Sequence, residues 1–165
     1  MELELSDKEF KSFRDLIAQR AGIYFESGKQ ELLRTNLLQR MEDCGLSNFA
    51  DYFQLLSSPA GTKEFDHLLN LIIIPETYFF RDQAQFRALE HFIIPESLKN
   101  ESDSGSSLRI WSAGCSTGEE PYTIALIVAA GMAGVKYPSV QILATDVSNA
   151  ALETARQGVY GARSV

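Results

Sequence analysis

The sequence predicts an α/β protein in two parts: an all-α N-terminal domain over residues 1–75 and a domain with parallel strands over residues 76–165. Apolar residues recur at helical spacing through the first part, which indicates packed helices. In the second part, the apolar runs 108–111 and 140–143 each lead through small residues into a helical pattern. Two strand–helix units in succession imply parallel strands joined by a right-handed crossover.

Composition narrows the class of protein. At 165 residues, with 45% apolar and 22% charged residues, the chain can bury one ordinary core or two small ones. No apolar run reaches the roughly 18 residues of a membrane span, and the acidic start is unlike a signal peptide, so we expect a cytoplasmic protein without direct membrane insertion. The net charge of −7 argues against nucleic-acid binding. The two cysteines and two histidines lack metal-ligand spacing, so no metal site is expected.

Four helices are predicted in the first part. Ser6 opens a capping box and Gly22 ends the first helix. Ser27 is expected to cap the second helix, Ser47 to start the third, and Pro75 to halt the fourth. Their apolar stripes are read as core positions; they are Phe10, Phe13 and Ile17, then Leu33, Leu37 and Met41, then Phe49, Phe53 and Leu56, then Phe65, Leu68, Leu69, Ile72 and Ile73.

The second helix also carries Lys29, Arg34 and Arg40, which could form a basic face toward an acidic partner. Acidic residues of the same helix offset these charges. We therefore expect a solvated, charge-neutral helix face.

Segment 76–82 reads Glu-Thr-Tyr-Phe-Phe-Arg-Asp, and three consecutive aromatic rings do not fit a surface helix, so something is expected to bury them. In one interpretation the rings pack under a following helix, predicted over residues 83–91, and Arg81 pairs with a nearby acid. In the other, Arg81 is a fixed cation facing a pocket and Thr77 offers its hydroxyl to a ligand. Residue type alone favours the first. The polar stretch 100–107 is expected to be a linker.

The stretch around residues 108–130 has the pattern of a ligand-binding strand, turn and helix. Its apolar run, which includes Trp111, suits a buried strand. Gly114 and Gly118 allow a close approach of backbone or ligand, and Pro121 suits a first helical turn, so the helix should begin within a residue or two of Gly118. Open α/β sheets bind ligands at such a strand end.

The residues around this turn also indicate the kind of ligand. Asp146 follows the second strand, where its carboxylate can accept from both hydroxyls of a ribose. Its separation from Gly114 exceeds the roughly 20 residues of the dinucleotide pattern, and the turn lacks Gly-x-Gly-x-x-Gly. Glu119 and Glu120 complement the helix dipole but would repel a phosphate. The predicted ligand is therefore an adenosine without phosphates, and S-adenosylmethionine fits that description.

Four stretches resemble the chemotaxis receptor methyltransferases of the CheR type. They are segment 76–82, the run Trp-Ser-Ala-Gly-Cys-Ser-Thr-Gly-Glu-Glu-Pro-Tyr-Thr at 111–123, Ala-Thr-Asp-Val at 144–147, and Ala-Arg-x-Gly-x-Tyr at 155–160. The helical leader, with Ala-Gly-Ile at 21–23, is similar to the family's N-terminal domain. The resemblance implies the first part of a Rossmann-like, S-adenosylmethionine-dependent methyltransferase domain behind an all-α domain.

The resemblance further implies methylation of glutamate side chains on the cytoplasmic domain of methyl-accepting chemotaxis receptors. The products would be glutamyl methyl esters and S-adenosyl-L-homocysteine. By position, Thr77, Arg81, Gly114, Glu119 and Asp146 would contact S-adenosyl-L-methionine, and Arg81 would also be catalytic. A competing class is a non-catalytic module that docks on receptors or binds the cofactor; a nucleotide-phosphate-binding protein is disfavoured by the acids at the helix start.

The chain also departs from the family pattern. Asn36, Gln39 and Glu42 stand where arginines are expected in enteric relatives, and Pro75 stands where some members have asparagine. Family members continue beyond the position of Val165, so we expect a chain truncated after the first part of the catalytic domain, with weak or no activity of its own. Two parallel strands with bare edges also predict self-association.

Overall fold

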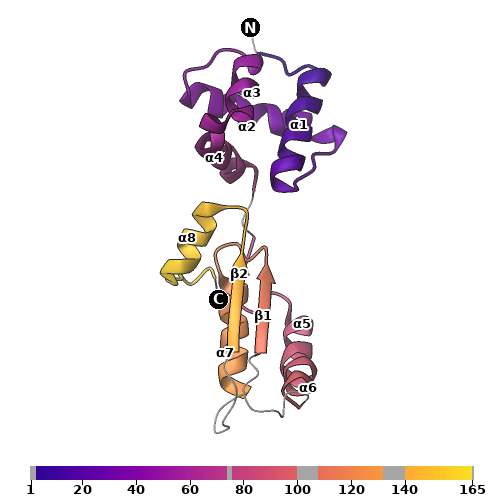
Figure 1. Ribbon diagram of the computed structural model, residues 1–165, viewed down its shortest axis with the longest axis vertical. Helices are drawn as coiled ribbons and strands as arrows, with labels where there is room; N and C mark the ends of the chain where they lie inside the picture. The colour runs from indigo at the N-terminus through magenta and orange to yellow at the C-terminus, as the bar shows by residue number, and fades with distance from the viewer. Residues whose placement is uncertain (1–2, 74–75, 100–107, 132–139, 165) are drawn as a thin grey trace. The chain divides into compact units, whose positions relative to one another are not determined.

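The computed structural model describes residues 3–73, 76–99, 108–131 and 140–164 of the chain (Figure 1). Two compact units, Met1–Ile74 and Pro75–Val165, are distinguished by their internal contacts. The predicted linker 100–107 and the predicted helix stop at Pro75 lie outside the described residues. Within the described ranges, none of the helices combines the length and the apolar character that crossing a bilayer requires.

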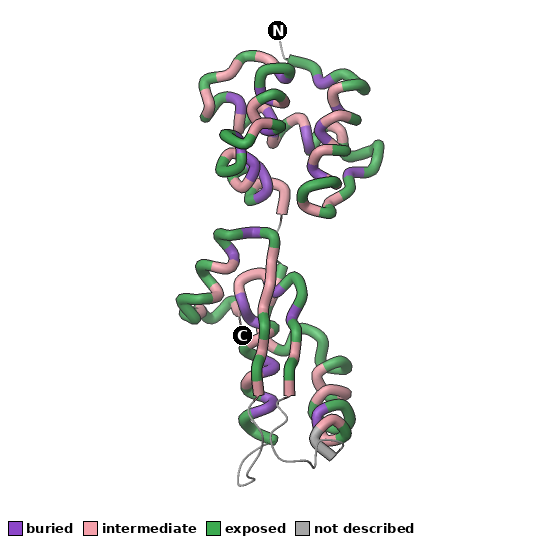
Figure 2. Tube along the Cα trace, in the orientation of Figure 1, coloured by how far each residue is buried: buried purple, intermediate pink, exposed green. Residues whose placement is uncertain are grey.

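The first unit is a helical bundle, as predicted. Its elements are α1 (Asp7–Ala21), a 3₁₀ turn (Ser27–Lys29), α2 (Gln30–Asp43), α3 (Phe49–Ser57), a second 3₁₀ turn (Pro59–Gly61) and α4 (Thr62–Ile72). The predicted stripes form its core, which Figure 2 shows as buried stretches on each helix. Three predicted core residues, Phe53, Ile72 and Ile73, are only partly buried at its margin, and Tyr52, absent from the predicted stripe, is fully buried.

Helix ends in this unit were predicted with mixed success. The capping box at Ser6 is formed, and Gly22 ends α1 in the left-handed conformation with φ +70°. Ser27 is not a cap, because it begins the 3₁₀ turn that precedes α2. The cap of α3 is Asn48 and not Ser47: its side-chain oxygen accepts from the backbone N–H of Asp51 at 2.8 Å.

The prediction of a solvated, charge-neutral face on α2 is wrong for Arg40, whose side chain is only 15% exposed. Its Nε and Nη2 donate to the two carboxylate oxygens of Glu64 on α4 at 2.8 and 2.6 Å. The hydroxyl of Tyr52 on α3 donates to the same carboxylate at 2.8 Å. A polar network therefore joins three helices where a surface charge was expected.

The second unit is built on two parallel strands, which confirms the predicted α/β class. Its elements are α5 (Gln83–Ala88), a π-helical segment (Leu89–Ile93), α6 (Ile94–Lys99), β1 (Leu108–Ala113), α7 (Glu119–Gly131), β2 (Val140–Thr145) and α8 (Asn149–Gln157). In the sheet, Ile110 lies opposite Ile142 and Trp111 lies opposite Leu143. Ser148 caps α8, and Gly158 ends it at φ +62°, both as predicted.

Side chains of the two strands alternate between a covered and an open face. On the covered face, Ile110 and Ile142 join the apolar residues of α7, which runs behind the strands in Figure 1. On the other face, Trp111 is 67% and Leu143 is 60% exposed. The prediction that Trp111 belongs to a buried strand is therefore wrong, because only alternate positions are covered.

Candidate functional site

The turn after β1 is joined to the end of β2. Gly114 adopts φ +76°, a conformation that glycine reaches without strain. The backbone N–H groups of Gly114 and Cys115 both donate to the carbonyl oxygen of Thr145, at 2.8 and 2.9 Å. The two strand ends and the turn therefore form one edge, at the position where open α/β sheets bind ligands.

Asp146 braces this turn. One carboxylate oxygen accepts from the backbone N–H of Ser116 at 2.8 Å, and the other accepts from the N–H of Ser148 at 2.8 Å. Ser116 is held at φ +47°, an uncommon conformation for a residue with a side chain. Asp146 thus fixes the turn and the start of α8 together, and its predicted contact with a ribose stays a prediction.

Gly118, at the start of α7, lies where a larger residue cannot fit. A Cβ atom there would lie 2.5 Å from the hydroxyl of Tyr160 and 2.8 Å from the Cβ of Ala155, and its φ is +102°. The Tyr160 hydroxyl donates to the carbonyl oxygen of Thr117 at 2.8 Å. Burial, with the nearby charge of Glu119, raises the pKa of Tyr160 to about 12, so this hydroxyl keeps its proton at neutral pH.

Segment 76–82 is anchored through two aromatic residues. The ring of Phe79 meets the ring of Tyr160 edge-on, with centroids 5.0 Å apart. The backbone N–H of Phe80 donates to the hydroxyl of Thr123 on α7 at 3.2 Å. The expectation that all three rings are buried is wrong, because Tyr78 is 48% and Phe80 is 43% exposed.

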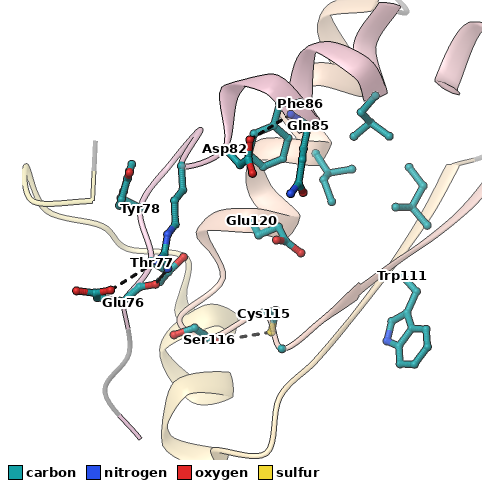
Figure 3. A pocket seen from close by; sticks show the side chains of 15 residues that line it. Glu76, Thr77, Tyr78, Asp82, Gln85, Phe86, Trp111, Cys115, Ser116 and Glu120 are labelled. Carbon is teal, nitrogen blue, oxygen red and sulfur yellow. Dashed lines mark hydrogen bonds and ion pairs between the residues drawn. The ribbon is translucent and has the colours of Figure 1, made fainter. Parts of the chain in front are cut away.

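This segment and the turn enclose one side of a hollow of about 580 Å³ (Figure 3). It is lined by Glu76, Thr77, Tyr78, Arg81, Asp82, Gln85, Phe86, Leu89, Ile110, Trp111, Gly114, Cys115, Ser116, Glu120 and Ile124. Of the five predicted site residues, Thr77, Arg81 and Gly114 are brought together here. Glu119 and Asp146 are not part of the lining.

Arg81 matches both interpretations of its segment at once. It lines the hollow, and it also pairs with an acid, since its Nη2 lies 3.5 Å from the Oε2 of Glu76. Its Nη1 donates to the backbone carbonyl oxygen of Glu76. Both contacts come from one residue of the same segment, Glu76: one from its backbone and one from its side chain.

The two acids at the start of α7 point in different directions. Glu119 is only 3% exposed and accepts from the hydroxyl of Thr117 at 2.6 Å. Glu120 lines the hollow and accepts from the hydroxyl of Ser112 at 2.6 Å. The sequence prediction named Glu119, whose contact with the cofactor stays a prediction; Glu120, which it did not name, lines the hollow together with Ile124, four residues later on the same helix face.

The charge of the described lining is negative, because it holds three acidic residues, Glu76, Asp82 and Glu120, and one basic residue, Arg81. Such a lining suits a ligand that carries positive charge and opposes a phosphate. Burial, followed by the charge of Asp146, raises the pKa of the Cys115 thiol, which therefore stays protonated and forms an apolar wall.

One buried polar atom beside the hollow, the hydroxyl oxygen of Ser116, lacks a hydrogen-bond partner among the described residues. Buried polar atoms in folded proteins nearly always have a partner in protein, water or ligand. The turn therefore has unused hydrogen-bonding capacity next to the cavity.

Comparison with known protein families covers almost the whole chain. Residues 8–73 match the family described as CheR methyltransferase, all-alpha domain. Residues 75–165 match the one described as CheR methyltransferase, SAM binding domain, where SAM is S-adenosylmethionine.

Individual relatives agree with these matches. The chain is 35% identical, over 99% of its length and 56% of the relative's, to chemotaxis protein methyltransferase 2 of Vibrio cholerae. It is 33% identical to chemotaxis protein methyltransferase of Borreliella burgdorferi, over 97% of this chain and 57% of that protein. With chemotaxis protein methyltransferase of Escherichia coli it shares 34% identity, over 96% of this chain and 52% of that protein.

The chain thus spans about half the length of the curated relatives that it matches. One matched region lies in each of the two compact units. All residues that line the hollow belong to the region matched to the S-adenosylmethionine-binding domain. The chain therefore belongs to the CheR methyltransferase family, with S-adenosylmethionine as the cofactor of its second domain.

Proposed function

We propose that this chain is the cofactor-binding part of a protein-glutamate O-methyltransferase that acts in the cytoplasm on methyl-accepting chemotaxis receptors. The observation that carries the proposal is the acidic hollow at the strand ends, where Thr77, Arg81 and Glu120 converge in the region matched to the S-adenosylmethionine-binding domain. The names of the relatives support the receptor system.

The donor set of the hollow fits this cofactor. Its sulfonium and ammonium groups are cations, which the carboxylates of Asp82 and Glu120 would stabilise. Its adenine ring is apolar on both faces, and aromatic rings such as Phe86 offer a matching surface. The unpartnered hydroxyl of Ser116 adds a donor and an acceptor beside the same cavity.

When bound, S-adenosylmethionine supplies a methyl group on a positively charged sulfur. A glutamate side chain is already ionised at neutral pH, so the protein needs no strong base to activate it. The task of the chain is then alignment and a fixed electrostatic environment. We assign to Arg81 the orientation of a carboxylate in the hollow, and to Asp146 the bracing of the turn, together with the ribose contact predicted from its position.

Methyl transfer tests this proposal directly. The intact protein, as made in its natural host, is mixed with a receptor cytoplasmic domain and cofactor that carries a radiolabelled methyl group. We expect label on the receptor that mild base releases as methanol, the signature of a carboxyl ester, and no label where the acceptor glutamates are replaced by glutamine.

Arg81→Ala should lower kcat by about 100- to 1,000-fold, as expected when a positioned charge is removed from an active site. Arg87→Ala is the matched control, because Arg87 lies on α5 outside the lining of the hollow. Label that resists mild base would contradict glutamate as the acceptor. Cofactor binding without any transfer would favour a docking module over an enzyme.

A further inference from the structure

An ion pair between two residues of the chain, Glu76 and Arg81, lies in the wall of the hollow. Both side chains line the cavity, and Nη2 of Arg81 is 3.5 Å from Oε2 of Glu76. Arg81 is the one cation among the described lining residues. A ligand carboxylate that enters the hollow therefore meets an arginine that already faces a carboxylate.

This pair is weak enough to exchange. The side chain of Glu76 is 83% exposed and that of Arg81 is 52% exposed. Exposed ion pairs contribute little to stability, because water screens both charges. A carboxylate that other contacts hold in place can pair with a guanidinium through two parallel hydrogen bonds, which is the stronger arrangement. Such a ligand can displace Glu76 from Arg81.

We propose that Glu76 is an internal stand-in for a ligand carboxylate, which occupies the Arg81 position in the free protein and leaves it when the ligand binds. The proposal rests on the function proposed above. Two groups share the required chemistry: the amino-acid carboxylate of the cofactor and the side chain of the substrate glutamate. Glu76 is thus a residue that sets ligand affinity, and it takes no part in bond making.

The substitution Glu76→Gln shows whether the Glu76 carboxylate competes with the ligand for Arg81 or holds Arg81 in position for the ligand. It removes the charge but leaves the backbone carbonyl group that accepts from Nη1 of Arg81, so the guanidinium keeps that anchor. If Glu76 blocks Arg81 in a fraction of free molecules, the apparent affinity for the ligand is reduced by that fraction. For an exposed pair, we expect the substitution to raise the affinity about two- to sixfold.

Calorimetry with two nucleosides distinguishes the two sources of carboxylate. S-adenosylhomocysteine carries the amino-acid carboxylate, whereas 5′-methylthioadenosine lacks it. If the cofactor displaces Glu76, Glu76→Gln binds S-adenosylhomocysteine about two- to sixfold tighter and methylthioadenosine equally well. If the substrate does so, both nucleoside affinities stay the same and the KM of the intact enzyme for the receptor falls by a similar factor at constant kcat.

Two control variants test whether the effect is specific to the Glu76–Arg81 pair. Glu153→Gln breaks an exposed pair of the same length, 3.5 Å to Arg156, outside the lining of the hollow, and should change neither affinity. Asp82→Asn removes a charge from the same lining, where its carboxylate caps α5 by accepting from the N–H of Gln85. This variant reports the effect of the lining charge alone.

Three results would overturn the proposal. If Glu76→Gln leaves the nucleoside affinities and the KM for the receptor unchanged, Glu76 does not compete for Arg81. If the variant binds S-adenosylhomocysteine more weakly, Glu76 holds Arg81 in position. If its affinity rises no more than that of Asp82→Asn, the effect is one of general charge. A wild-type chain that binds neither nucleoside refutes the cofactor site itself, so this failure is distinguishable from the others.

Discussion

Gly118 shows how a single residue can set the geometry of the candidate site. It connects the turn to α7, and the Tyr160 hydroxyl and Ala155 lie closer to it than any Cβ could tolerate. Tyr160 in turn contacts Phe79, in the segment that carries Thr77 and Arg81. The absence of one side chain thus lets three segments of the second unit meet.

Gly118→Ala should therefore destabilise the second unit by about 2–4 kcal/mol, through overpacking and strain at positive φ. The affinity for S-adenosylhomocysteine should fall more than about tenfold, a binding cost above about 1.4 kcal/mol, because the turn and segment 76–82 would be displaced from each other. Urea unfolding followed by fluorescence measures the first effect, because the single tryptophan, Trp111, lies in this unit.

Gly131→Ala is the matched control. Gly131 is the last residue of α7, and a Cβ there would meet nothing within 4 Å. The same substitution at this helical position should leave the affinity unchanged and stabilise the unit by at most about 1 kcal/mol. Equal affinities of Gly118→Ala and the wild type would show that the turn tolerates displacement.

The sequence did not indicate which of two adjacent acids, Glu119 and Glu120, lines the hollow. Adjacent helical residues point about 100° apart, and of Glu119 and Glu120 it is Glu120 that lines the hollow. Composition and dipole arguments apply equally to both. The hydrogen bond from the Thr117 hydroxyl turns the Glu119 carboxylate toward the turn, and this contact could not be predicted from residue type.

Three helices of the first unit are joined by charged hydrogen bonds among Arg40, Tyr52 and Glu64. Burial opposes ionisation of Glu64, but hydrogen bonds from Arg40 and Tyr52 outweigh it, so the pKa of Glu64 is lowered. A group whose pKa is lower in the folded state stabilises that state above its unfolded pKa, about 4.3 for glutamate. This stabilisation is lost as the pH falls through the folded pKa.

Glu64→Gln should therefore destabilise the first unit by about 1–3 kcal/mol at pH 7, because charged hydrogen bonds are lost. The difference from the wild type should shrink as the pH drops below about 4. Urea unfolding followed by circular dichroism across this pH range tests both statements. Fluorescence of Trp111, in the second unit, should show an unchanged transition.

Glu31→Gln provides the comparison for this prediction, since Glu31 is 79% exposed and pairs with Arg34 on the same helix at 3.1 Å. It should cost less than about 0.5 kcal/mol. A Glu64→Gln variant that is equally mild, or whose deficit persists at pH 3, would contradict the role of the network.

Helices were predictable where their apolar period is long, as in α1, α2 and α4. Helix ends were less so, because neighbouring polar residues compete for one cap: Ser47 and Asn48 are both good candidates, and the structure uses Asn48. Arg40 was misread because its partner Glu64 lies on another helix. Contacts between distant elements leave no periodic signal in the sequence.

For the whole molecule, the succession of helical stripes followed by two strand–helix units was enough to predict the class, and parallel pairing follows from the crossover rule. Strand burial was not predictable, since Trp111 and Leu143 lie on a face left open among the described residues. Within the described residues, both this face and the outer edges of the two strands are open, a pattern that favours association. Self-association stays a prediction.

The central claim is that the hollow binds an S-adenosyl ligand. The most direct measurement is a calorimetric titration of the chain with S-adenosylhomocysteine and, in parallel, with ATP, which carries the same adenosine on phosphates. We predict a saturable signal for S-adenosylhomocysteine and none for ATP, because three carboxylates line the cavity. Binding of ATP in preference to S-adenosylhomocysteine, or of neither, would contradict the account.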